Sequence, residues 1–162
     1  MYGGIIMDWS LSAFLFTVGI CLISLIVAGI TERKCKDGKE WFAGLKHPDS
    51  AFLLKAMLIV GFVFFPYFGF ILYTAFIGNA LVSIILATSV IVIHGFSPLL
   101  KYKTRNLRLF FCVMLVLPFI MIALIIFMFQ TNIISAILAI VFIFWLAYDL
   151  SYYFRLMKMN KY

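Results

Sequence analysis

The basic residues of this chain are confined to alternate connections between long apolar segments. Five such segments run over residues 9–30, 51–76, 79–96, 107–129 and 133–155. All 13 Lys and Arg residues lie in or beside residues 31–50, residues 97–108 or the C-terminal tail. Because Lys and Arg in short loops stay on the cytoplasmic side of a membrane, the pattern predicts five crossings. The N-terminus is then expected outside and the C-terminus in the cytoplasm.

The composition indicates an all-α integral membrane protein. Hydrophobic residues make up 66% of the chain and charged residues 12%, which lies outside the range of soluble globular domains. A membrane-spanning helix needs about 20 apolar residues to cross a core of about 30 Å, and residues 79–96 form the shortest of the five segments. The segments are continuously apolar, without the alternation of barrel strands. We therefore expect one five-helix bundle over residues 1–162, with residues 31–50 as its single long loop.

Several other classes of protein and site are not indicated by the sequence. The formal net charge of +7 is explained by membrane orientation beside anionic lipid, and no basic soluble domain is present to bind nucleic acid. Cys21, Cys35 and Cys112 form neither a metal pattern nor a disulfide framework. There is no nucleophile with a base at suitable spacing and no phosphate-binding glycine loop, so no catalytic residue is predicted.

The long loop holds the most informative local sequence. Residues 31–40 are polar and mixed in charge, which predicts a solvated turn. They are followed by the string Trp41-Phe42-Ala43-Gly44-Leu45-Lys46-His47-Pro48, which leads into the next apolar segment. An aromatic pair at this place is an interfacial anchor in its simplest interpretation, because Trp favours the headgroup level. The order of the residues in the string is a more specific signal.

This string resembles that of the translocator protein family, also called tryptophan-rich sensory or TspO/MBR proteins. The family carries Trp-Tyr-Ala-x-Leu-x-Lys-Pro after the first of five helices, and the residues that match are Trp41, Phe42 (for Tyr), Ala43, Leu45 and Pro48. The aromatic end of the last segment, with Trp145, Tyr148, Tyr152 and the terminal Asn160, is similar too. The chain departs from the family in lacking its Pro-Pro pair, where Phe52 and Leu53 stand, and in having no Trp between Trp41 and Trp145.

The resemblance implies a membrane-embedded binding protein for a hydrophobic planar ligand. Translocator proteins bind tetrapyrroles such as porphyrin and haem, and also sterols, in a pocket between the helices beneath the long loop. Sensing, ligand transport and porphyrin breakdown are roles proposed for the family. No obligatory cofactor is implied. The alternative from another class is an accessory or scaffold subunit of a membrane complex, which would turn its aromatic residues outward and leave no cavity.

The residues themselves also indicate an aromatic pocket with a polar inner end. Segment 51–76 is rich in Phe and Tyr around Pro66, which can kink a helix and open space beside it. Lys55, His94 and Asp149 are expected at similar depth near the cytoplasmic face, and ionisable groups in membrane segments usually face the bundle interior. The alternatives are lipid-facing packing for the aromatic residues, snorkelling or a structural ion pair for Lys55 and Asp149, and an interfacial cap for His94. The predicted ligand-binding residues are Trp41, Phe42, Leu45, Pro48, Lys55, Phe62, Phe65, Tyr67, His94, Trp145, Tyr148, Asp149 and Tyr152.

The expected partners are membrane lipid, a tetrapyrrole or sterol-like ligand, and a second copy of the chain. Ala80, Ser83 and Ala87 recur at helical spacing and permit close backbone approach, which indicates either a homodimer contact or packing within one chain. Leu150, Tyr152 and Arg155 fit a short sterol pattern that matches readily by chance. The bias towards Ile, Phe and Lys indicates a prokaryotic plasma membrane.

Overall fold

The protein is built from helices joined by short connections. The computed structural model describes residues 3–48 and 51–161, with side chains described for residues 11–48, 60–61 and 63–161. The helices are α1 (Gly3–Lys34), α2 (Lys36–Ala43), α3 (Ala51–Ile77), α4 (Leu81–Thr104), α5 (Leu107–Met114), α6 (Val116–Thr131) and α7 (Ile133–Met159). No strand occurs in the described ranges, which confirms the all-α prediction.

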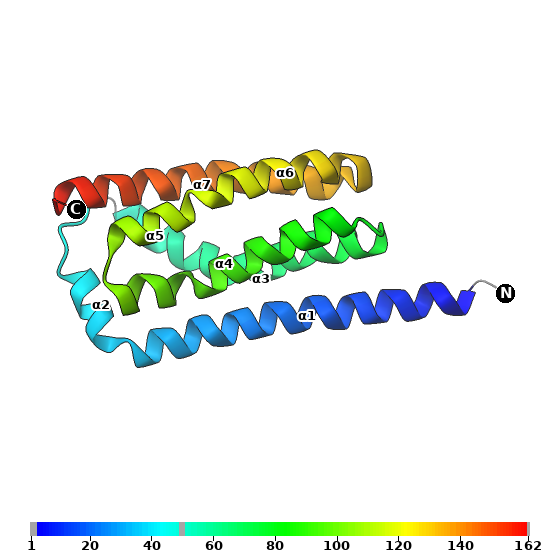
Figure 1. Cartoon of the computed structure of the whole chain (residues 1–162), viewed down its shortest axis with the longest axis horizontal. Helices are drawn as coiled ribbons and strands as arrows, with labels where there is room; N and C mark the ends of the chain where they lie inside the picture. Colours follow the sequence, from blue (N-terminus) through cyan, green and yellow to red (C-terminus); the bar gives the residue numbers. More distant parts are fainter. Residues whose placement is uncertain (1–2, 49–50, 162) are drawn as a thin grey trace.

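The long helices lie side by side along one axis (Figure 1). α1 packs against α4 and α3, while α7 packs against α6, and α4 also contacts α6. α5 and α6 follow one another in the same direction along the bundle (Figure 1). α1 begins at one end of the bundle, whereas α2 and the end of α7 share the other end (Figure 1). α4 therefore lies between the remaining helices and connects the two sides of the molecule.

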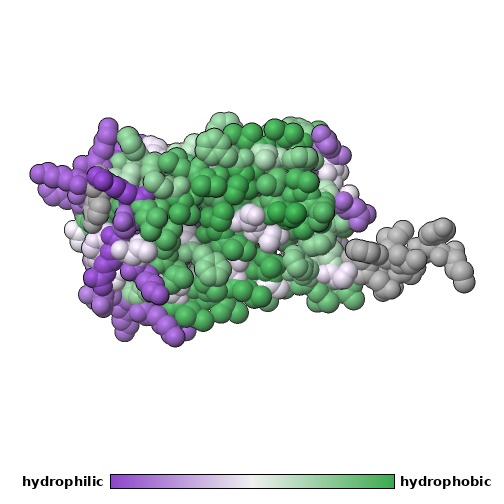
Figure 2. Space-filling model, viewed as in Figure 1, coloured by the Kyte–Doolittle hydropathy of each residue, from purple (hydrophilic) through white to green (hydrophobic). Residues whose placement is uncertain are grey.

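The surface of the bundle is that of a membrane protein. Four segments in the described part of the chain are long and apolar enough to cross a membrane: Leu11–Lys34, Leu81–Thr104, Leu107–Thr131 and Ile133–Met159. Large apolar side chains lie exposed on these segments, among them Phe119 and Phe144, which are 73% and 72% exposed. Figure 2 shows a hydrophobic body with hydrophilic residues gathered mainly at the end that holds α2. A soluble monomer rarely exposes so much contiguous apolar surface, so the chain is a multi-pass integral membrane protein.

α4 continues well past the expected end at residue 96 and reaches Thr104. Pro98 lies inside the helix and has no N–H to donate to the carbonyl of His94, one turn earlier. The Ser97 hydroxyl donates a 2.8 Å hydrogen bond to that carbonyl instead. The prediction of residues 79–96 was therefore too short, because hydropathy registers the polar Ser-Pro pair and the following Lys but not the helix that continues through them. Arg105, with a φ of 50°, ends the helix in the left-handed conformation.

The fourth apolar segment is divided into α5 and α6 at Leu115. Pro118 lies in the first turn of α6 and cannot donate to the carbonyl of Met114, with which α5 ends. The missing hydrogen bond accounts for the interruption of the segment expected over residues 107–129. The sequence indicated a bend of this segment at Pro118, since proline kinks a helix.

The polar part of the long loop is helical, so its prediction as a solvated turn was wrong. α1 extends to Lys34, and α2 follows after Cys35. Gly38 of α2 lies so close to α4 that a Cβ at this position would be 2.8 and 2.9 Å from the carbonyl carbon and Cα of Tyr102. The close backbone contact holds α2 against the end of α4.

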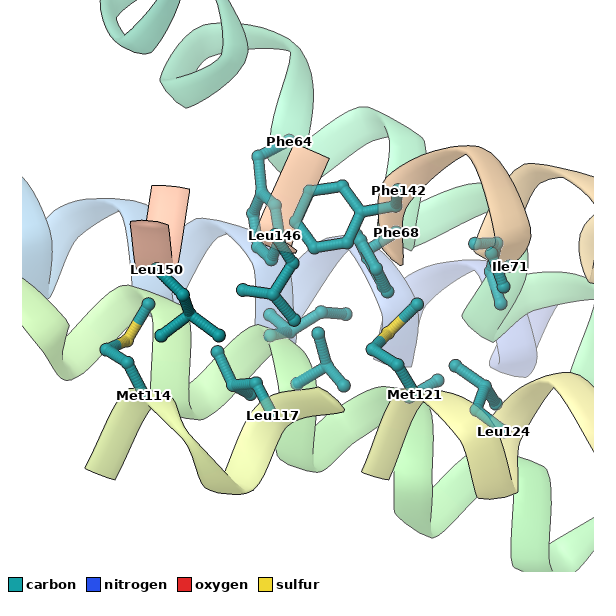
Figure 3. Packing of buried hydrophobic residues seen from close by; sticks show 14 of the residues in the cluster. Phe64, Phe68, Ile71, Met114, Leu117, Met121, Leu124, Phe142, Leu146 and Leu150 are labelled. Atoms are coloured by element: carbon teal, nitrogen blue, oxygen red, sulfur yellow. The ribbon is translucent and has the colours of Figure 1, made fainter. Parts of the chain in front are cut away.

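The apolar core is formed mainly by α3, α4, α6 and α7. Figure 3 shows Phe64 and Phe68 of α3 beside Phe142 of α7, with Met121 and Leu124 of α6 on the opposite side of the core. The Phe68 and Phe142 rings pack edge to face with their centroids 4.7 Å apart. Edge-to-face packing of this kind adds to the stabilisation that burial provides.

Small residues allow α4 to approach its neighbours closely. A Cβ at Gly95 would lie 2.6 Å from the Cβ of Ser24 on α1. Ser83 and Ala87 are fully buried within the single chain. Their burial favours the intramolecular alternative for this stripe, and a homodimer contact through residues 79–96 stays a prediction.

Candidate functional site

A cavity of about 370 Å³ lies between α3, α4 and α7, close to the end of the bundle that carries α2. Its walls are largely aromatic, and the rings that line it are Phe42, Phe65, Tyr102, Phe110, Trp145, Tyr152 and Tyr153. Its polar side chains are Glu32, His94, Ser97, Lys101 and Asp149. The cavity thus combines flat apolar walls with a small number of ionisable groups, as small-molecule sites do.

Lys101 is the lysine that lines the cavity, and aromatic rings surround its ammonium group. Its Nζ lies 4.6 Å from the ring centroids of both Phe42 and Tyr102, and 5.8 Å from those of Phe110 and Tyr153. It also donates a 3.3 Å hydrogen bond to the Tyr153 hydroxyl. Ring faces attract a cation but accept no conventional hydrogen bond from it, so Lys101 keeps donor capacity for a ligand.

Asp149 brings a carboxylate to the same cavity from α7. The two ion pairs found among the described residues are Lys39–Glu32 at 3.0 Å and Arg105–Asp37 at 3.5 Å, and neither includes Asp149 or Lys101. One turn before Asp149, Trp145 lines the cavity from the same face of α7. A cation, a carboxylate and an indole therefore line one cavity without a salt bridge between the two charges.

His94 lies deeper, where α4 faces α3. Its ring stacks on Phe64 with a centroid distance of 3.7 Å and an interplanar angle of 24°. The Phe65 ring meets it at a steeper angle, with centroids 6.3 Å apart. Since one face of the imidazole is covered by Phe64, the ring is held in a fixed orientation at the cavity wall.

The second half of the long loop is fastened to the end of α7. The Asn160 side chain accepts a 2.9 Å hydrogen bond from the Lys46 backbone N–H and donates a 3.0 Å bond to the Lys46 carbonyl. His47 Nδ1 lies 2.6 Å from the Tyr152 hydroxyl, and its Nε2 lies 2.9 Å from the Phe42 carbonyl oxygen. These bonds hold Phe42, a lining residue, over the cavity.

A second cavity of about 300 Å³ adjoins the first between α3 and α7. Val60 and Trp145 line both cavities. The remaining lining is apolar apart from Tyr67, whose hydroxyl donates to the Leu138 carbonyl and is thereby satisfied. Val60 and Trp145 are consequently the side chains that separate the polar cavity from the apolar one.

The structure brings many of the predicted site residues together. Those that line the main cavity are Phe42, Phe65, His94, Trp145, Asp149 and Tyr152. Trp41 and Leu45 pack on the apolar core instead, and Tyr67 lines the second cavity. Tyr148 is 39% exposed beside Trp145, and Pro48 is partly buried in the loop. The side chains of Lys55 and Phe62 lie outside the described residues.

Lys101 and Tyr153 are lining residues that sequence reasoning missed. Lys101 counted only as a charge that orients the chain, and Tyr153 was not among the predicted ligand-binding residues. Helical spacing indicated Lys101: it follows His94 by seven positions, close to two turns, so both residues face the same side of a continuous helix. The spacing was not informative while the helix was expected to end at residue 96, because Lys101 then lay outside it.

No group of three or more His, Cys, Asp or Glu that could hold a metal ion occurs among the residues that the structure describes. Comparisons of the chain with protein-family models, curated proteins and solved structures found no match. The function is therefore inferred from the cavity itself.

Proposed function

We propose that this protein binds a hydrophobic planar ligand that carries an acid group, of the tetrapyrrole class, within the membrane. The observation that carries the proposal is the aromatic-walled cavity in which Lys101 lies among ring faces with donor capacity left over. Sensing or transport of the ligand is the role we propose for the bound state.

The proposed topology has five crossings, with the N-terminus outside and the C-terminus in the cytoplasm. It is supported by α1 beginning at one end of the bundle and α7 ending at the other (Figure 1). It is also supported by the basic residues, which lie beside α2, the end of α4 and the end of α7. In this topology the cavity lies near the cytoplasmic face.

The side chains suit such a ligand in three ways. Offset stacking on Phe65, Trp145 and Tyr152 is favourable for a flat conjugated ring system. Lys101 can donate a charge-assisted hydrogen bond to a ligand carboxylate, and such bonds contribute about 1.5–3 kcal/mol each. The loop held by Asn160 and His47 limits access of water to this ion pair.

The main cavity alone is small for a macrocyclic ligand. A volume of about 370 Å³ lies near the lower limit for small-molecule sites, which span roughly 300–1,000 Å³. A tetrapyrrole would extend into the adjoining cavity of about 300 Å³ when Trp145 turns aside. For haem, His94 would be the residue that offers a ring nitrogen to the iron, while a porphyrin without metal would need only the stacking surfaces and Lys101.

Membership in the translocator protein family is part of the proposal. It is supported by the loop string and by the way this string meets the last helix, where His47 bonds to Tyr152 and Asn160 bonds to Lys46. The scaffold alternative requires outward-facing aromatic residues on α3. Phe64, Phe65 and Phe68 are only 1%, 7% and 0% exposed, which favours the binding protein, while Phe70 of the same helix is 45% exposed.

The test is a titration of the purified protein in detergent with protoporphyrin IX, followed by tryptophan fluorescence and the Soret band. We expect saturable binding that weakens about 10- to 100-fold in Lys101→Met, the factor that corresponds to a lost charge-assisted bond. Asp149→Asn should bind as tightly as wild type or more tightly, since it removes a negative charge close to the ligand acid.

Two controls separate the acid contact from general effects. Lys158→Met removes an exposed lysine at the same end of the bundle and should leave the affinity unchanged. The dimethyl ester of protoporphyrin IX carries no acid, so its binding should not respond to Lys101→Met. Absence of saturable binding, or an equal loss in Lys158→Met, would overturn the proposal.

A further inference from the structure

A second ligand-accessible surface lies on α4 and α5, away from the aromatic cavity walls. It is a groove of about 480 Å³, lined on α4 by Val92, Phe96 and Leu100 and on α5 by Val113. The α4 residues recur every four positions and therefore share one face of the helix. Apart from Ser97 the groove is lined by apolar side chains as far as Lys103 and Thr104.

We propose that this groove binds one anionic phospholipid, with an acyl chain between α4 and α5 and the phosphate at Lys103. From Val92 to Thr104 the helix advances about 18 Å at 1.5 Å per residue. That length is close to the thickness of one leaflet, about half of the 30 Å hydrocarbon core. The groove can thus accommodate one acyl chain along the leaflet whose headgroups lie at the basic end.

The charges at this end select an anionic headgroup. Lys103, Arg105 and Arg108 are all exposed. Residues 101–148 contain no Asp or Glu. Arg105 is paired with Asp37 of α2 at 3.5 Å, whereas Lys103 and Arg108 take part in no ion pair among the described residues. A zwitterionic lipid offers its own cation to this basic surface, so a net negative headgroup is favoured.

The test is native mass spectrometry of the purified protein in detergent, titrated with phosphatidylglycerol or with phosphatidylcholine of the same acyl chains. We expect phosphatidylglycerol to bind more tightly in the wild type. Lys103→Gln should weaken phosphatidylglycerol about fivefold, the factor equal to about 1 kcal/mol per basic residue at an anionic surface. It should weaken phosphatidylcholine less, because the choline cation of that lipid offsets the attraction between its phosphate and Lys103.

A second variant tests the groove itself. Val92 is 36% exposed and faces outward, so Val92→Phe fills the groove without disturbing the core. It should weaken both lipids. Val82→Phe, at another exposed position of α4 outside the groove, and Lys158→Gln, at the end of α7, are the matched controls and should bind both lipids as the wild type does.

Equal affinity for the two lipids in the wild type would overturn the proposal. So would an effect of Lys158→Gln as large as that of Lys103→Gln, since it would show an unspecific response to charge. The proposal does not rest on the tetrapyrrole site, because no variant in this experiment alters Lys101 or the aromatic walls.

Discussion

The close contact of α2 with α4 can be tested by one added methyl group. In Gly38→Ala, the new Cβ would lie 2.8 and 2.9 Å from the carbonyl carbon and Cα of Tyr102, and closer still to its carbonyl oxygen. Carbon atoms pack best at about 3.5–4.0 Å, so α2 would have to move away by roughly 1 Å. The obstacle is helix backbone, which cannot turn aside as a flexible side chain would.

The expected loss of stability follows from two opposing effects. Overpacking costs about 1–3 kcal/mol, with the upper end expected against backbone. The higher helix propensity of Ala offsets about 1 kcal/mol of this. A net loss of about 2 kcal/mol should lower the midpoint of thermal unfolding by roughly 4–8 °C for a chain of this size. The movement also withdraws the Phe42 ring, now 4.6 Å from the Lys101 ammonium, so ligand affinity should fall as well.

The measurement is thermal unfolding in detergent, followed by circular dichroism. Gly29→Ala is the matched control, because a Cβ at Gly29 would meet no atom within 4 Å. This control should unfold at the wild-type midpoint or slightly above it. If Gly38→Ala unfolded together with Gly29→Ala, α2 would not pack on α4 as described, and the loop would not hold the cavity closed.

Two further predictions concern single hydrogen bonds. Asn160→Ala removes both bonds to the Lys46 backbone and should speed hydrogen exchange at the Lys46 amide, whereas Asn160→Asp, which keeps the acceptor, should retain much of the protection. Tyr67→Phe removes the hydroxyl that donates to the Leu138 carbonyl and should cost about 0.5–1.5 kcal/mol of unfolding free energy. Tyr73→Phe, which loses a hydroxyl without a hydrogen bond among the described residues, should cost less, and equal costs would contradict the role of the Tyr67 bond.

Most of the helical architecture could be predicted from apolar length alone. The ranges expected at residues 9–30 and 133–155 lie inside α1 and α7, because a continuous apolar run of this length has few alternatives in a bilayer. Hydropathy does not predict helix ends and short polar helices that depend on hydrogen bonds or on close backbone contacts. It gave no indication of α2, which is short and polar and owes its position to the contact at Gly38. It also placed the end of α4 at a Ser-Pro pair through which the helix continues.

The candidate site was predictable in part for a related reason. His94 and Asp149 stood out because ionisable groups are costly inside a membrane segment. Lys101 did not, since it belongs to a cluster of basic residues whose presence the orientation of the chain already explains. Its distinguishing property is the set of rings around it, contributed by α2, α4, α5 and α7. Only the tertiary structure brings those rings together.

The Ser97–Pro98 pair links the continuation of α4 past residue 96 to the position of Lys101 in the cavity. A proline at this position leaves the His94 carbonyl without its backbone donor, and an unsatisfied carbonyl in a membrane protein costs several kcal/mol. The Ser97 hydroxyl supplies the missing donor, so α4 keeps its helical register across the proline. That register puts Lys101 on the face that also carries His94, and both residues line the same cavity. The side chain that repairs the helix therefore determines where the cation of the proposed binding site is placed.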